Sequence, residues 1–165
     1  MRIFNCFTCS LALVVLVLLG GCGGGEQAGG AVVAKTTLTG PAPGVKSIEI
    51  TLILPATVTP EMDPSTGNPK VTALSPNNVT SSNGLLYVAY TPASGAAGGR
   101  IKIVVIRGDA PFIEGDFLSI PCVVEAGKPV PSPGQFTYTD LKVWDTSGND
   151  ITSQSSGATV TAVVR

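Results

Sequence analysis

Apolar and polar side chains alternate well between Ser47 and Leu54, and this alternation limits the possible folds more than any other feature of the chain. Ile48, Ile50 and Leu52 fall on one face of the segment together with Leu54. A period of two is typical of a half-buried β-strand. Seven further segments have strand-like composition, and no segment of helical length combines a period of 3.6 with capping residues. The expected strands are 31–38, 47–54, 70–74, 84–91, 100–107, 116–125, 136–144 and 158–164.

Turn-forming residues separate these strands, since the 165-residue chain holds 20 Gly and 13 Pro. Short strands with frequent turns are typical of a β-sandwich or a jelly roll. The formal net charge is only −1, and no basic patch of the kind that nucleic-acid binding needs is visible. We therefore expect an all-β domain, a jelly-roll β-sandwich of eight or nine strands, that does not bind nucleic acid.

Three strands carry more specific predictions. Segments 84–91 and 100–107 flank a glycine-containing loop and predict a hairpin, in which 100–107 is an interior strand because its centre is apolar on both faces. The loop at 95–99 lacks the Lys-Ser/Thr pair and the helix of a phosphate-binding loop, so we interpret it as the hairpin tip. In segment 116–125, Pro121 cannot donate a ladder hydrogen bond, which predicts a bulge or an edge position.

The start of the chain has the features of a secretion signal. Arg2 precedes an apolar run at 11–19, and a membrane-spanning helix needs about 20 apolar residues, roughly twice this length. The run ends in Leu19-Gly20-Gly21-Cys22, which resembles the lipobox of bacterial lipoproteins. The resemblance implies that residues 1–21 are a cleaved lipoprotein signal peptide and that Cys22 is lipidated. Residues 22–30 would then be a Gly-rich linker, and residues 31–165 the β-sandwich domain. We expect a lipid-anchored, extracytoplasmic protein in the cell membrane or, by the same resemblance, in the outer membrane, since Gly23 directly after Cys22 is not acidic.

The cysteines and the lack of histidine limit the chemistry. No histidine is present, which excludes Ser-His-Asp and Cys-His triads and zinc sites built with histidine. Cys6 and Cys9 lie in the expected signal peptide, and Cys22 would carry lipid, so Cys122 is the one cysteine left in the domain. We expect its thiol to pack as a small buried hydrophobe, and we predict that the protein is not an enzyme.

From Ala31 to Val164 the chain resembles a cohesin-type domain. The segments that carry the resemblance are GVKSIEITLILPATV, LLYVAYTPASGAAGGRIKIVVI, FIEGDFLSIPCVV, and FTYTDLKVWDTSGNDI with ATVTAV. The resemblance implies a nine-stranded jelly roll that docks a protein on one sheet face. In that family the partner is a dockerin, a small calcium-loaded helical module, in assemblies that act on polysaccharides. Related sandwiches include carbohydrate-binding modules. The alternatives are therefore a module that binds polysaccharide, or a structural envelope lipoprotein without a dedicated ligand.

The aromatic residues near the C-terminus are the candidate ligand contacts, and two arrangements of their strand are open. In an unbroken strand Phe136, Tyr138 and Trp144 share one face with Asp140 and Lys142, which would suit a sugar or a protein partner. A bulge near Thr139-Asp140 would leave only Trp144 pointing outward. The side chains that would then point inward are Phe136, Tyr138, Leu141 and Val143. Core packing is the commoner fate, and we expect it also for Tyr87, Ala89 and Thr91.

Acidic loops supply the remaining candidates. Asp145, Asn149 and Asp150 could bind calcium, which takes six to eight oxygen ligands, but a hairpin turn with Gly148 or Asn149 at positive φ explains the same residues. Segment 63–68 has the same two interpretations. The carboxylates of Asp109, Glu114 and Asp116 are close in sequence, and we expect them in a solvated loop rather than as a glycosidase pair.

Overall fold

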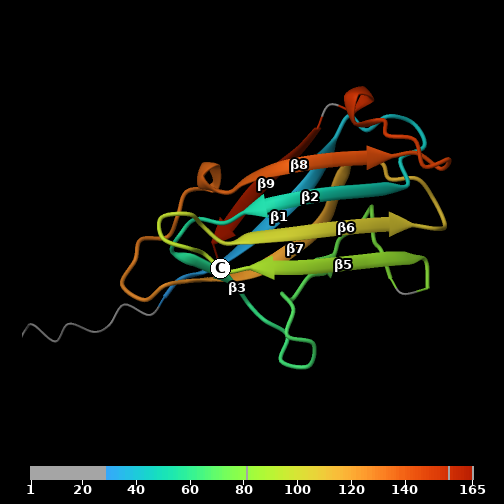
Figure 1. Cartoon of the computed structure of the whole chain (residues 1–165). Coiled ribbons are helices and arrows are strands. Elements are labelled where there is room, and N and C mark those ends of the chain that lie inside the picture. Colours follow the sequence, from blue (N-terminus) through green and yellow to red (C-terminus); the bar gives the residue numbers. More distant parts are fainter. Residues whose placement is uncertain (1–28, 81, 156, 165) are drawn as a thin grey trace, which may run out of the picture.

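The computed structural model describes residues 29–80, 82–155 and 157–164. The expected signal peptide at 1–21, Cys22 and most of the 22–30 linker therefore lie outside the described residues. Within the described ranges the chain is all-β, with nine strands in two antiparallel sheets that share one core, as in a β-sandwich (Figure 1). No described helix is long and apolar enough to cross a bilayer.

The front sheet has the strand order β5-β6-β2-β8. Its strands are β5 (Gly84–Thr91), β6 (Arg100–Arg107), β2 (Ser47–Ile53) and β8 (Thr137–Trp144). The back sheet has the order β3-β7-β1-β9, with β4 also paired to β7. Its strands are β1 (Ala31–Thr39), β3 (Val58–Pro60), β4 (Thr72–Ala73), β7 (Gly115–Val124) and β9 (Gly157–Val164). Two short 3₁₀ turns, η1 (Pro133–Gln135) and η2 (Thr152–Gln154), flank β8 and β9.

Alternation along the strands builds the core, as the sequence predicts. On β2, Ile48, Ile50 and Leu52 are fully buried, and they meet back-sheet residues such as Leu118 and Ile120 in one hydrophobic cluster. The hairpin of β5 and β6 is confirmed, and β6 is an interior strand between β5 and β2. The short strand β3 is the one strand that the sequence analysis missed, because three residues are too few to show a period.

A bulge interrupts β8, so the second of the two arrangements considered for this strand is confirmed. Glu49 pairs with Lys142 and Thr51 with Thr139, which leaves two β8 residues opposite one β2 residue. Asp140 has a φ of 55° at this point, and a residue in the left-handed region is a common component of such bulges. The unbroken strand, with all even-numbered side chains on one face, is wrong. The side chains that pack on or into the core are Phe136, Tyr138, Leu141 and Val143.

Pro121 lies in the interior strand β7, without a bulge at its own position. Its carbonyl oxygen accepts the N–H of Glu61 at 2.8 Å, beyond the end of β3. The carbonyl of Glu61 is in turn bonded by the N–H of Lys70 at 2.7 Å, so no donor from the proline is needed. The strand therefore has no bulge at Pro121. The alternative expectation, an edge position, holds at this one residue, because the nitrogen of Pro121 faces the gap between β3 and β4.

The start of β1 and the start of β2 are at opposite ends of the molecule (Figure 1). The end of β9 pairs beside the start of β1, through Val32 and Val164. β1 then runs the length of the back sheet, about 3.3 Å per residue, before residues 40–46 lead into β2. Ser47 and its neighbour Trp144 are therefore at the end of the sandwich that is farthest from Ala31.

Candidate functional site

The outer face of the front sheet carries rows of side chains fixed by strand register. The first row is Trp144, Ser47, Ile106 and Leu85, and the second is Lys142, Glu49, Val104 and Tyr87. Leu85 is 55% exposed, Tyr87 53% and Ile106 38%, while Val104 and Trp144 are half-buried. We refer to Leu85, Tyr87, Val104, Ile106 and Trp144 as the apolar patch. Contiguous exposed apolar side chains of this kind mark interaction sites in soluble proteins.

The position of Tyr87 corrects an expectation. Core packing was expected for the face of β5 that carries Tyr87, Ala89 and Thr91, but this face points outward. The inward face consists of Leu86, Val88 and Tyr90. Because both faces of β5 are apolar, the sequence pattern could not distinguish the inner from the outer one.

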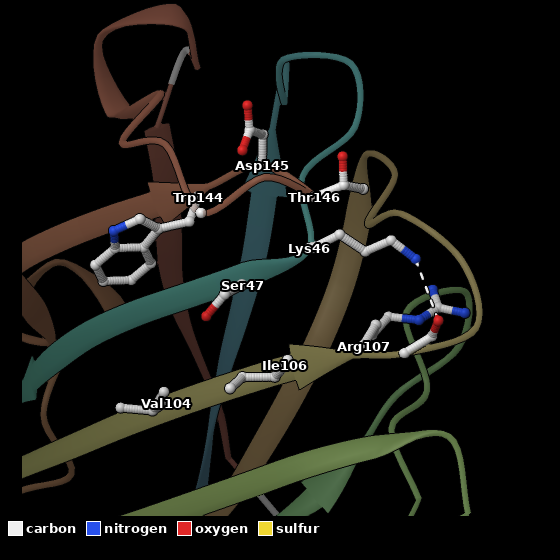
Figure 2. A pocket seen from close by; sticks show the side chains of 10 residues that line it. Lys46, Ser47, Val104, Ile106, Arg107, Trp144, Asp145 and Thr146 are labelled. Atoms are coloured by element: carbon white, nitrogen blue, oxygen red, sulfur yellow. Dashed lines mark hydrogen bonds between the residues drawn. The ribbon is translucent and has the colours of Figure 1, made fainter.

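A pocket of about 570 Å³ opens at the Trp144 end of the apolar patch (Figure 2). Its walls include the indole of Trp144 and the side chains of Val104 and Ile106. Lys46 and Arg107 supply cationic groups at its edge, and the ammonium of Lys46 donates to the carbonyl of Gly108 at 3.4 Å. The pocket thus combines an aromatic wall and an apolar floor with the ammonium of Lys46 at its edge.

Arg107 is held in place by several partners. Its guanidinium donates Nε to Asp109 Oδ1 at 3.2 Å and lies 5.7 Å from the ring centre of Phe112, within cation–π range. The hydrogen bond and charge of Arg107 lower the pKa of Asp109. The guanidinium is therefore a fixed part of the pocket wall.

Charged side chains border the patch along the centre of the sheet. Lys102 donates to Glu49 at 2.7 Å, and Glu49 pairs in register with Lys142 on its other side. Hydrogen bonding to Glu49 raises the pKa of Lys102. An apolar centre with a charged border is the usual composition of a protein-binding face.

The Asp145 loop is a closed turn. Asp145 Oδ1 accepts the N–H groups of Ser147 at 2.8 Å and Asn149 at 2.9 Å, and its Oδ2 accepts the Asn149 side chain at 2.9 Å. These hydrogen bonds lower the pKa of Asp145. Gly148 takes a φ of 79°, as the turn interpretation expects. Asp150 is used separately, since its Oδ1 accepts the N–H of Thr152 at 2.9 Å.

The other acidic candidates are also placed in turns or local pairs. Asp63 Oδ1 accepts both the N–H and the hydroxyl of Ser65, at 2.8 and 2.6 Å, which lowers the pKa of Asp63. Asp109 is paired with Arg107, and Asp116 accepts the hydroxyl of Thr37 at 2.6 Å. Across the part of the chain that the structure describes, no three His, Cys, Asp or Glu side chains gather as metal ligands would.

Cys122 packs as the sequence predicts. It is fully buried in the core, and burial raises the pKa of its thiol to about 12. Its Sγ lies 3.5 Å from the carbonyl of Ile120. A thiol with this pKa is protonated at neutral pH and does not act as a nucleophile.

The two predicted ligand contacts are separated. Trp144 is on the outer face and lines the pocket, whereas Tyr138 packs against the core from the inner face. Sequence reasoning did not identify Leu85, Ile106 or Lys46 as site residues. The available signal was that strands 84–91 and 100–107 hold more apolar residues than one buried face requires.

The comparisons with known proteins add no relative. No family model, no curated protein and no solved structure matches the chain. The function is therefore argued from the site.

Proposed function

We propose that this protein is a non-catalytic binding module, held at a bacterial membrane by lipid on Cys22, that docks a protein partner on the outer face of its front sheet. The observation that carries the proposal is the apolar patch. Tyr87 and Leu85 each expose more than half of their surface, and aromatic residues of this kind dominate the energy of protein interfaces.

The position of the patch also supports docking. Trp144 and its pocket are at the end of the sandwich opposite Ala31, where the linker would join the domain. A lipid on Cys22 would hold the Ala31 end near the membrane and leave the pocket facing away from it. The outer face of the back sheet has polar side chains at its centre and not apolar ones. There the register aligns Lys35, Ser119 and Thr161.

The resemblance to cohesin-type domains supplies the class of partner. On that interpretation the sandwich is a jelly roll and the partner is a dockerin-like module with two calcium loops, attached to a protein that acts on polysaccharide. The lipid anchor and the outer-membrane location belong to the same proposal. Neither the Asp145 loop nor the 63–68 loop is needed for calcium, because the calcium would be carried by the partner.

A carbohydrate-binding module is the second candidate, and the pocket favours it. The half-buried indole of Trp144 and the side chain of Lys46 line the same pocket. A flat aromatic wall with nearby polar groups is a common arrangement for holding a small ligand. A structural envelope lipoprotein would need neither the pocket nor the patch.

Affinity capture from the native cells tests the proposal. The immobilised chain is exposed to lysate and secreted proteins, once with calcium and once with a chelator. We expect one protein that is retained only with calcium and whose sequence contains two calcium loops. Saturable binding of a polysaccharide that is lost in Trp144→Ala, with no protein retained, would replace docking by the carbohydrate function. Retention of neither would leave a structural role.

A further inference from the structure

The outer edge of β5 carries backbone groups that no other strand among the described residues pairs with. Gly108 donates its N–H to the carbonyl of Asn83 at 2.7 Å. In an antiparallel ladder this hydrogen bond means that the odd-numbered residues of β5 bond to β6 and the even-numbered ones do not. The N–H and C=O groups of Leu86, Val88 and Tyr90 therefore point away from the sheet. A row of such groups is a template for a further strand.

The other sheet edges are each protected against such pairing. β8 has the bulge at Asp140 and the exposed charge of Lys142. β3 has three residues and ends in Pro60, and β4 has two residues. β9 is in contact with η1 and β8. β5 has eight residues and no charge, proline or bulge, so its own sequence carries none of the features that block an edge. β9 is equally long and uncharged, and it differs from β5 in its contacts with η1 and β8.

Space for an added strand exists beside this edge. A groove of about 450 Å³ lies between β5 and segment 63–72. Leu86 and Val88 line it on the β5 side, and the opposite side is formed by Asp63, Asn68, Pro69, Lys70, Val71 and Thr72. Leu86 and Val88 face the core side of the sheet but remain only half-buried. The inner-face side chains of an added strand would enter this groove and complete their burial.

We propose that β5 pairs antiparallel with β5 of a second copy of this chain, which joins two front sheets into one continuous sheet. The strand is uncharged and the whole chain has a formal net charge of −1, so two copies repel each other little. The outward-pointing N–H and C=O groups of one β5 must face those of the other. The two-fold axis therefore passes between a residue and the same residue of the second copy, which are directly opposite each other.

The axis through Tyr87 gives the best match of side chains. Leu86 then faces Val88 of the second copy, and the two Tyr87 rings form a cross-strand aromatic pair. Tyr90 is then opposite Gly84 of the second copy, whose N–H already bonds the carbonyl of Thr80 at 3.0 Å, so the new ladder ends beyond the two pairs of Leu86 with Val88. The axis is perpendicular to the sheet, so both apolar patches lie on the same side of the joined sheet. Pairing at the edge leaves their outer surfaces available, and the proposal is independent of what the patch binds.

Disulfide formation between single cysteines tests the pairing in the full chain at the membrane. Cβ atoms of directly opposed residues are about 4.5–5.5 Å apart, close to disulfide range, so Tyr87→Cys should give a covalent dimer under mild oxidation. Leu85→Cys is the matched control, because Leu85 is on the same face and equally exposed. In the proposed register the two Leu85 positions are four residues apart along the strand, or about 13 Å. We expect at least tenfold more dimer from Tyr87→Cys than from Leu85→Cys, above the background of the unchanged chain. Equal yields would overturn the proposal.

Sedimentation of the detergent-solubilised full chain provides a second test. The unchanged chain should be a dimer, and Tyr87→Lys and Tyr87→Glu should each be monomers because like charges would meet at the axis. An equal mixture of the two variants should restore the dimer. A monomeric unchanged chain, or a mixture that stays monomeric, would overturn the proposal. A dimer that both charged variants retain would assign the contact to another surface and overturn it as well.

Discussion

The bulge at Asp140 decides which side chains of β8 reach the outer face. A substitution at Asp140 should change the free energy of unfolding in one direction if the bulge is present and in the other direction if the strand is regular. Asp140 is exposed, and its φ of 55° is in the left-handed region. A β-branched residue in that region costs roughly 1–2 kcal/mol. Asp140→Val should therefore lower the free energy of unfolding by about 1–2 kcal/mol, which corresponds to about 3 °C in Tm for each kcal/mol in a domain of this size. The hydrogen bond that Thr139 donates to Asp140 at 2.9 Å is exposed and adds little.

In a regular strand the same substitution would act in the other direction. Valine is preferred over aspartate at an exposed strand position by up to about 1 kcal/mol, so Asp140→Val would stabilise the domain. Asp140→Gly is a second test of the bulge. Glycine accepts the bulge conformation, but it weakens a regular strand by about 0.5–1 kcal/mol. With the bulge we expect Asp140→Gly to stay within about 0.5 kcal/mol of the original chain, as its relief of strain offsets its looser unfolded state.

Urea unfolding followed by circular dichroism measures these differences through linear extrapolation. Lys142→Val is the control, because Lys142 is exposed on the same strand beyond the bulge and has regular pairing with Glu49. It should change stability by no more than about 0.5 kcal/mol. A stabilised Asp140→Val together with a destabilised Asp140→Gly would refute the bulge and, with it, the inward position of Tyr138.

Three further predictions concern the core and the loops. Burial raises the pKa of Cys122 to about 12 from a reference of 9.0. The stabilising contribution of the buried thiol is therefore complete below pH 9 and decreases by about 1.4 kcal/mol per pH unit as the pH rises toward the folded pKa. Cys122→Ala should lose stability less steeply over this range, and parallel curves of stability against pH for the two chains would contradict the burial of the thiol. Ile103→Ala, at a fully buried position of the interior strand β6, should lower the free energy of unfolding by about 2–5 kcal/mol. Lys102→Ala next to it should have a much smaller effect, because an exposed ion pair contributes little, and equal effects in urea unfolding would be inconsistent with the sandwich core. Calcium should leave the Tm of the domain unchanged relative to chelator, because both carboxylate oxygens of Asp145 already accept hydrogen bonds within the turn, and a calcium-dependent rise in Tm would show that the loop binds the ion.

Much of the fold follows from local pattern. The alternation at Ser47–Leu54 identifies both the strand and its buried face, since one face is apolar throughout and the other is mostly polar. The hairpin of β5 and β6 follows from two apolar segments around a glycine loop. The three residues of β3 could not be predicted, because their pairing with β7 is a tertiary contact between segments far apart in the chain.

The site was harder to predict than the fold. Trp144 was identified because it is the single tryptophan, and its exposure depends on a bulge for which the sequence allowed two arrangements. Tyr87 was assigned to the core because strands with apolar residues on both faces are usually buried on both. Only the position of β5 at the edge of the front sheet, with no layer over its outer face, explains why this side chain is exposed.

Binding by face-specific variants tests the central claim most directly. The partner captured with calcium is titrated against Ile106→Asp, in the apolar patch, and against Val163→Asp, the same kind of change at an exposed position of the back sheet. A charge in the centre of the docking face should weaken binding by roughly 30-fold or more, and Val163→Asp should bind like the original chain. Unchanged affinity of Ile106→Asp, or an equal loss in both variants, would contradict docking on the front sheet.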